Sequence, residues 1–253
     1  LHRQVITPFK AVWNYAEYND LCEPRRWRDP VVRKGTRHRR KPPKRGTAPV
    51  AYDRAATLVT AMWPLDAITM TVLFYTALRP IEWLEMRPDD IDLAGGVLKV
   101  AASKTGHGRS VPIHSFLKPI LQAHLNWLPD KSPRVAVRRN QQSDWIAPYP
   151  SLENSGGQLN SAVRSAARRT GITDISPYCA RHSANTEMAN AGIREDIREE
   201  LLGHAKEKTN RLYVGIPLFL LADAIETIPV VDIWRKAEFA ENPQSFYEKI
   251  RKN

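Results

Sequence analysis

The apolar residues of this chain recur mostly at helical spacing. Residues 4–20 carry apolar side chains three and four positions apart, which predicts a helix with one apolar face. The residues of that face are Val5, Phe9, Val12, Trp13 and Ala16. Because a single helix cannot bury itself, we expect this one to belong to a domain or to pack against one.

From residue 48 onward the pattern predicts a mostly helical domain. Helices are expected at residues 52–62 and 65–78, and the second is apolar on all sides, which predicts deep burial. A short helix follows at residues 80–86 and begins with Pro80, which the first turn tolerates. Further helices are expected at residues 115–127, 158–170, 177–191, 194–202 and 217–227, with a short piece near residue 213.

Two short stretches have the pattern of strands. Residues 97–102 and 109–113 follow a turn at residues 92–96, and a glycine-bearing loop joins them, which predicts an antiparallel hairpin. Residues 130–157 are rich in Pro, Arg, Ser and Gly and are expected to be irregular. The predicted fold class is therefore α+β, mostly α, with a small antiparallel sheet.

The last segment, residues 231–253, is expected to be helical and amphipathic. Its apolar residues are Trp234, Phe239, Phe246, Tyr247 and Ile250. These side chains need a partner, which is either a second copy of the chain or the chain's own domain.

Composition excludes several classes of protein. A chain of 253 residues with 42% apolar residues can bury a substantial core, so it is not a disordered protein. No run approaches the roughly 20 apolar residues that cross a bilayer, so no membrane is expected. Two cysteines are too few for a disulfide framework, and residues 1–10 have no signal-peptide pattern. The low cysteine content fits a reducing compartment.

The positive charge is concentrated in one segment. The chain has 38 basic and 27 acidic residues, a net charge of +11, and residues 25–46 alone contribute +10. Their basic residues are Arg25, Arg26, Arg28, Arg33, Lys34, Arg37, Arg39, Arg40, Lys41, Lys44 and Arg45. The segment also holds three prolines, which favours an extended linker. Three interpretations are open: a solvated linker, a nuclear or nucleolar localisation signal, and a segment that binds along the phosphates of DNA. We favour the third, because each neutralised phosphate releases counterions and so favours binding.

Motifs for metals and cofactors do not occur in the sequence. The seven histidines include no H-x-x-x-H pair, the cysteines are isolated, and the glycine-rich nucleotide loops are missing. Asp89, Asp90 and Asp92 cluster after a helix, where acidic residues commonly cap helices and form turns. We expect no metal and no cofactor.

Two arginines stand where helices begin or end. Arg79 directly follows an apolar helix and needs water, a carboxylate or an anion as its partner. An ion pair with Glu82 or Glu85 is the alternative to a functional role. Arg181 lies near the start of a helix, a place that suits phosphate because the first N–H groups are unpaired there.

Three further candidates lie at loops. Lys104 is expected in the hairpin loop, where a solvated lysine is the alternative. His204 follows Gly203, which has the position of a helix C-cap, and the alternative is a capping or core histidine. Tyr213 comes nine residues after His204 and could equally be a packing tyrosine.

Together these residues resemble a known pattern. The run TALRPIEWL around Arg79, followed by DIDL, resembles the first arginine box of the tyrosine recombinases, the phage integrase family. The run SKTGHGRSVPI around Lys104 resembles the turn that carries the family's lysine. The run SPYCARH around Arg181 resembles the H-x-x-R-H box. LLGH at His204, with Tyr213 nine positions later, resembles the box that ends in the nucleophile.

The resemblance covers about residues 48–228 and implies a domain organisation. The implied parts are the last helix of a truncated core-binding domain at residues 1–24, a basic interdomain linker at 25–46, a catalytic domain at 47–230 and a helical tail at 231–253. The implied partner is double-stranded DNA at attachment sites, bound by a homotetramer on paired sites. The implied location is the cytoplasm, at the nucleoid, for a protein encoded by a prokaryote or a phage.

The resemblance also implies a reaction. Tyr213 would attack a DNA phosphodiester and form a 3′-phosphotyrosyl bond, with no need for metal or ATP. Arg79 and Arg181 would bind the phosphate oxygens, Lys104 would protonate the 5′-oxygen, and His204 would donate a hydrogen bond.

One position departs from the family pattern. Tyr178 stands where the H-x-x-R box usually begins with histidine, and a phenol is a poorer base than imidazole at neutral pH. We favour a Tyr178 that hydrogen-bonds the phosphate while water takes the proton. The alternatives for this position are a slow enzyme and a DNA-binding member that has lost cleavage. For the function as a whole, a further alternative is a type IB topoisomerase-like relaxer, which would use the same chemistry without strand exchange.

Overall fold

The computed structural model describes residues 7–19, 21–22, 48–101, 108–128, 152–203 and 215–252. Internal contacts divide the chain into two units, Leu1–Pro42 and Pro43–Asn253. In the first unit, helix α1 (Thr7–Tyr18) confirms the predicted helix within residues 4–20. The side chains of Phe9, Val12 and Tyr15 are more than half exposed, so the described part of this unit does not bury its apolar face.

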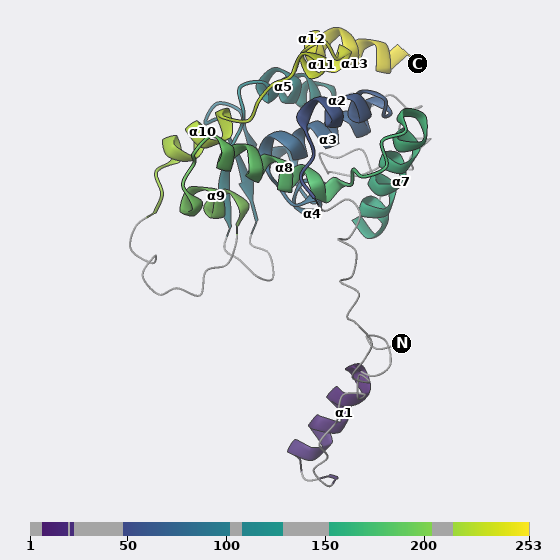
Figure 1. The fold of residues 1–253 in the computed structure, drawn as a ribbon, viewed down its shortest axis with the longest axis vertical. Coiled ribbons are helices and arrows are strands. Elements are labelled where there is room, and N and C mark those ends of the chain that lie inside the picture. The colour runs from purple at the N-terminus through teal and green to yellow at the C-terminus, as the bar shows by residue number, and fades with distance from the viewer. Residues whose placement is uncertain are drawn as a thin grey trace, which may run out of the picture. The chain divides into compact units, whose positions relative to one another are not determined.

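The second unit is a helical domain with one small sheet (Figure 1). Its helices run in chain order as α2 (Tyr52–Thr60), α3 (Pro64–Thr76), α4 (Pro80–Leu84), α5 (Leu117–Trp127), α7 (Leu152–Thr170), α8 (Pro177–Asn190), α9 (Glu195–Leu202), α10 (Leu218–Glu226), α11 (Asp232–Arg235), α12 (Glu238–Glu241) and α13 (Pro243–Lys252). Helix α3 lies at the centre, and its residues 65–76 are all buried. The sequence prediction of a deeply buried second helix is confirmed.

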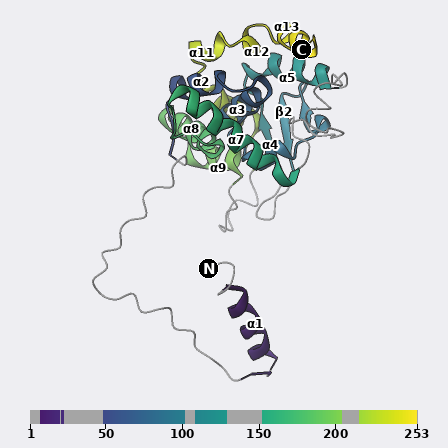
Figure 2. The same cartoon turned by 90° about the vertical axis from the view of Figure 1, so that its right-hand side faces the viewer.

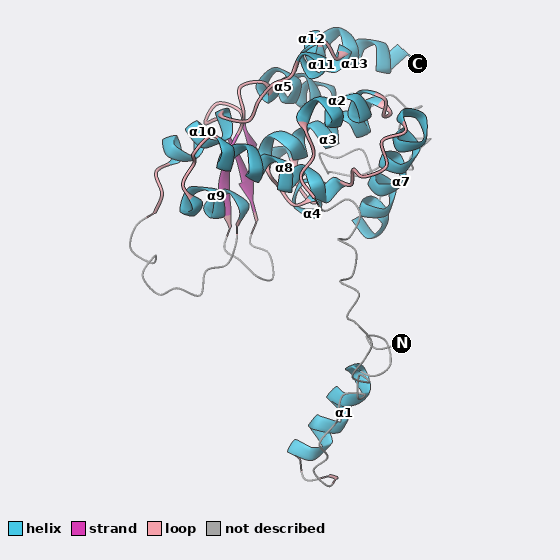
Figure 3. Cartoon of the chain, viewed as in Figure 1, coloured by secondary structure: helices cyan, strands magenta, loops and turns pink. Residues whose placement is uncertain are grey.

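The sheet differs from the prediction by one strand. In the described part of the chain it has three antiparallel strands, β1 (Ile91–Asp92), β2 (Val97–Val100) and β3 (Arg109–Pro112), in the order β1-β2-β3. Strand β1 is not predicted from the sequence, which places Asp92 in a turn and Ile91 in no element, because two residues are too few to show alternation. Helices α9 and α10 lie beside β3 (Figure 3).

Helix α7 begins earlier than predicted. Residues 130–157 were expected to be irregular, yet α7 starts at Leu152 and includes Gly156 and Gly157. The two glycines lower the helix propensity of this stretch, but they do not prevent it from being helical in the folded domain. Residues 129–151 lie outside the described residues.

The acidic cluster forms caps and turns, as predicted. The Asp90 carboxylate accepts a hydrogen bond from the Arg87 N–H at 2.8 Å, and the Asp92 carboxylate accepts one from the Gly95 N–H at 2.7 Å. Among the described residues no group of three or more His, Cys, Asp or Glu side chains could hold a metal ion. None of the described helices is long and apolar enough to span a bilayer.

The C-terminal segment folds back on its own domain. Helix α11 contacts α2, and α13 contacts α5 (Figures 1 and 2). Trp234 is fully buried, and Phe239, Phe246 and Tyr247 are each 4% exposed. The apolar residues predicted for the tail therefore join the main core. Of the two partners considered from the sequence, the structure shows the chain's own domain.

Candidate functional site

Arg79 is placed by an abrupt end of helix α3. Ala77 caps that helix in the left-handed conformation, with φ of 55°, which costs an alanine free energy. The chain then extends, and Arg79 becomes the N-cap of α4. Its backbone N–H donates to Glu82 Oε2 at 2.8 Å, and its Nη1 donates to Glu82 Oε1 at 2.8 Å. The ion pair that the sequence offered as the alternative for Arg79 is therefore present.

Arg181 enters the same region from helix α8. The residue is 6% exposed, and its guanidinium donates to the Ala77 carbonyl at 2.8 Å and to the Leu202 carbonyl. Burial, together with the nearby charge of Arg79, lowers the pKa of Arg181 to about 10. Arg181 therefore keeps its positive charge at neutral pH.

A third arginine, Arg109, completes the cluster and was missed in the sequence analysis. It opens strand β3, and its Nη1 and Nη2 donate to Glu82 Oε1 and Oε2 at 3.0 and 2.8 Å. Its Nε donates to the Leu201 carbonyl at 3.0 Å. The alternation of a strand could have indicated that Arg109 points inward. Arg109 and Val111 share a face of β3, and Val111 is fully buried.

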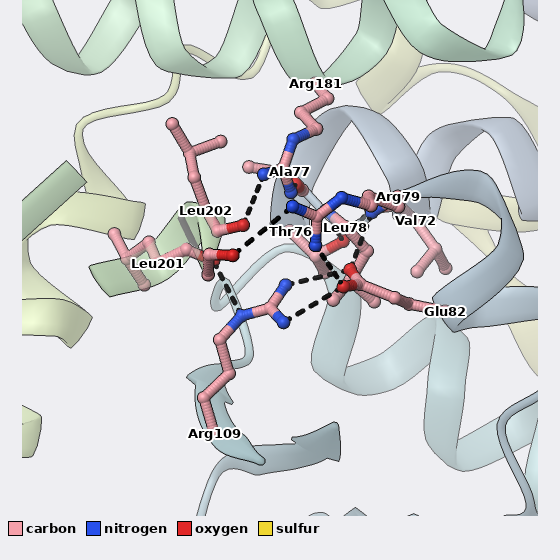
Figure 4. Close-up of polar contacts among 11 residues, drawn as sticks. Val72, Thr76, Ala77, Leu78, Arg79, Glu82, Arg109, Arg181, Leu201 and Leu202 are labelled. Atoms are coloured by element: carbon pink, nitrogen blue, oxygen red, sulfur yellow. Dashed lines mark hydrogen bonds and ion pairs between the residues drawn. The ribbon is translucent and has the colours of Figure 1, made fainter. Parts of the chain in front are cut away.

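Glu82 is the shared partner of two of these arginines (Figure 4). Burial by itself would raise the pKa of Glu82, but hydrogen bonds and charge from Arg109, with hydrogen bonds from Arg79, hold it below its usual value. The carboxylate is thus ionised at neutral pH. Three guanidinium groups surround one carboxylate in the described part of the site, which leaves an excess of two positive charges.

The arginines also meet the end of helix α9. Three consecutive carbonyls, those of Leu201, Leu202 and Gly203, accept hydrogen bonds from Arg109, Arg181 and Arg79 respectively (Figure 4). The last carbonyls of a helix have no partner within it and carry partial negative charge, so they suit guanidinium donors.

Gly203 ends α9 in the left-handed conformation, with φ of 60°. Its N–H donates back to the Glu199 and Glu200 carbonyls. The sequence prediction that Gly203 is a helix C-cap is confirmed.

The other predicted site residues divide into two groups. Tyr178 lies in the first turn of α8 and is 50% exposed. Lys104, His204 and Tyr213 lie outside the described residues, as do all the basic residues predicted to bind DNA between Arg25 and Arg45. The structure thus brings Arg79 and Arg181 together at the end of α9, and the roles of all the predicted site residues stay predictions.

The described cluster is suited to an anion. Guanidinium groups with excess positive charge and fixed geometry favour a multivalent oxyanion such as phosphate, because a planar guanidinium can donate two N–H groups to two oxygens of the tetrahedral anion at once. Each arginine is held by the hydrogen bonds that it donates to carbonyls of neighbouring elements, so little reorganisation is needed when charge develops nearby.

Comparison with known proteins points to one family. Residues 52–216 match the sequence model of the phage integrase family. Tyrosine recombinase XerC of Bifidobacterium longum (strain DJO10A) is 32% identical over 183 residues, which cover 69% of this chain and 50% of that protein. Tyrosine recombinase XerA of Pyrococcus furiosus is 29% identical, over 64% of this chain and 54% of that protein. The chain spans about half the length of these curated relatives.

Solved structures share the fold at low identity. The integrase from mycobacterium phage Brujita has a TM-score of 0.51 and 15% identity, over 90% of this chain and 73% of that chain. The Tn1549 transposon integrase, in complex with a circular intermediate DNA, has a TM-score of 0.52 and 12% identity, over 95% of this chain and 76% of that chain.

Proposed function

This chain belongs to the phage integrase family, and from that premise we propose that it is a tyrosine recombinase that cleaves and rejoins double-stranded DNA at attachment sites. The observation that carries the proposal is the convergence of Arg79 and Arg181 at the end of α9, with an excess of positive charge. From there the sequence continues to His204 and Tyr213.

The proposed reaction conserves the energy of the DNA backbone. The Tyr213 phenol oxygen attacks phosphorus, a bond from phosphorus to that oxygen forms, and the bond from phosphorus to the 5′-oxygen breaks. Lys104 gives a proton to the departing 5′-oxygen, and water takes the proton of the phenol. A second 5′-hydroxyl then reverses the attack, so neither ATP nor metal is required.

The arginines stabilise the charge of the transition state. Arg79 and Arg181 bind the non-bridging oxygens of the pentacoordinate phosphorus, and His204 donates a further hydrogen bond. Preorganised donors of this kind typically supply about 3 kcal/mol each when charge develops in a site that excludes water.

Tyr178 is proposed as a phosphate ligand rather than as a base. Its exposure of 50% leaves the hydroxyl open to an incoming substrate. It occupies the first turn of α8, three residues before the buried Arg181. The two side chains therefore approach a bound phosphate from one helix.

The proposed partner is duplex DNA, with a homotetramer on paired sites. The Tn1549 integrase structure is a complex with DNA, and the basic segment at residues 25–46 gives this chain a local charge of +10 for phosphates. The segment would follow the backbone without reading sequence, because phosphate contacts carry no base information.

The test is a covalent adduct. Sequences bound by the protein are first selected from a random duplex library, and the preferred site is then built as a nicked suicide duplex. We expect wild type to form a denaturant-resistant protein–DNA adduct, Tyr213→Phe to form none, and Tyr178→Phe to form it more slowly.

Other results would replace the proposal. Tight binding without an adduct in wild type would indicate a DNA-binding member that has lost cleavage. Relaxation of a supercoil without strand exchange between two duplexes would indicate a topoisomerase-like enzyme. An adduct with Tyr213→Phe would show that a different residue is the nucleophile.

A further inference from the structure

Arg109 differs from Arg79 in the exposure and the hydrogen bonding of its side chain. Its side chain is 7% exposed, against 24% for Arg79, and all three of its nitrogen atoms donate hydrogen bonds. Both oxygens of Glu82 receive its forked pair of N–H groups. Arg109 is therefore directed at the protein and not at a substrate.

The Glu82 carboxylate would otherwise cancel the charge of Arg79. Its side chain is 6% exposed, and in such surroundings an ion pair is poorly screened. With Arg109 present, the group formed by Arg79, Glu82 and Arg109 carries a net charge of +1. Without Arg109 the remaining pair would be neutral, and Arg79, whose Nη1 already donates to Glu82 Oε1 at 2.8 Å, would be the sole guanidinium bound to that carboxylate among the described residues.

Arg109 also joins segments that lie far apart in sequence. It opens β3, five residues after Lys104 in the sequence, and it binds the carbonyl of Leu201 in α9. Gly203 packs directly on its guanidinium, since a Cβ at Gly203 would lie 2.6 Å from Arg109 Nη1. The end of α9 is thus held against the same side chain that holds Glu82.

We propose that Arg109 is a positioning residue for the recombination reaction: it offsets the negative charge of Glu82 and fixes the end of α9, so that the charge of Arg79 is not fully compensated within the protein and is available to the scissile phosphate. This inference rests on the proposed function. It assigns Arg109 no contact with DNA.

The test compares rate, affinity and stability in the full chain. Single-turnover adduct formation on the nicked suicide duplex is measured at saturating protein for wild type, Arg109→Gln, Arg109→Lys and the double variant Arg109→Gln/Glu82→Gln. Arg54→Gln is the matched control, because Arg54 forms an ion pair with Asp174 in which both side chains are more than half exposed.

We expect Arg109→Gln to slow adduct formation roughly 10- to 100-fold with little change in DNA affinity, since a displacement of about 1 Å in a catalytic group can cost a factor of 100. Arg109→Lys, which keeps the charge and loses the fork, should be intermediate. The double variant should recover about tenfold over Arg109→Gln, because removing the carboxylate removes the need for its counter-charge. Arg54→Gln should match wild type.

A purely structural role would give a different pattern. Arg109→Gln would then lower the melting temperature while folded protein at low temperature formed adduct at the wild-type rate, and the double variant would show no recovery. Either of these two results would contradict the inference about Arg109. The proposed function would still stand, because wild type forms the adduct in both cases. If wild type forms no adduct, both proposals fail.

Discussion

At the scale of single residues, two left-handed positions shape the arginine cluster. Ala77, with φ of 55°, directs its carbonyl to Arg181, and Gly203, with φ of 60°, directs its carbonyl to Arg79. The glycine adopts this conformation without penalty, whereas the alanine carries strain. The strained conformation of Ala77 lies at the point where the backbone leaves the buried helix α3 and turns sharply toward Arg79.

Gly203→Ala is expected to destabilise the domain by more than the conformational penalty of about 1–3 kcal/mol. The new Cβ would lie 2.6 Å from an Arg109 guanidinium that hydrogen bonds to Glu82 and Leu201 already fix in place. Urea unfolding measures the loss. Ala77→Gly is the matched control and should change stability little, because glycine relieves the strain while one buried methyl is lost. Equal stability of Gly203→Ala and wild type would contradict the packing described.

At the scale of elements, the C-terminal helices complete the core. The Trp234 ring of α11 lies 5.2 to 5.6 Å, centroid to centroid, from the rings of Tyr52, Phe74 and Tyr75. Its indole N–H donates to Thr71 Oγ1 at 2.9 Å. In α13, Tyr247 bonds through its hydroxyl to His124 Nδ1 at 2.6 Å. The segment therefore belongs to the folded domain and is not a free tail.

Trp234→Ala should cost about 3–5 kcal/mol of unfolding free energy, the usual loss for a large buried aromatic residue. The measurement is the midpoint of urea denaturation at a constant slope. Ile233→Ala, at the neighbouring position, serves as control. Ile233 is 38% exposed, so its truncation should lower the unfolding free energy far less. A similar small effect for both variants would indicate that the segment leaves the domain in solution.

At the scale of the whole molecule, charge is divided unevenly. Residues 25–46 carry +10, while the remaining residues carry a net +1. The arginines of the candidate site are few and individually placed, and Glu82 offsets part of their charge. If the proposed function holds, the basic segment supplies bulk DNA affinity and the cluster supplies transition-state stabilisation.

Replacing Arg37, Arg39, Arg40 and Lys41 by Ala should flatten the slope of log K against log salt by up to about 3.6, at roughly 0.9 per phosphate contact. Affinity should fall alike for all DNA sequences, and adduct formation at saturating protein should persist. Fluorescence anisotropy at several salt concentrations gives the slope. An unchanged slope would remove the basic segment from the DNA interface.

Much of the fold was accessible from local patterns. Helical periodicity located the buried helix α3 and the apolar residues of the tail, and Gly203 was recognisable as a cap. Strand β1 was missed because two residues show no period, and the start of α7 was placed late because glycines lower helix propensity. The arginine motifs identified Arg79 and Arg181 but left the partner of Arg79 open.

The sequence by itself determined the family resemblance, the order of the motif residues and the concentration of charge in one segment, because each is a property of neighbouring residues. Only the tertiary structure decided that Arg109 binds Glu82 across 27 residues and Leu201 across 92, and that Arg79 reaches Gly203 across 124. Periodicity specifies which face of an element is buried. It does not specify which element covers that face, so pairing between distant polar groups depends on how the helices pack.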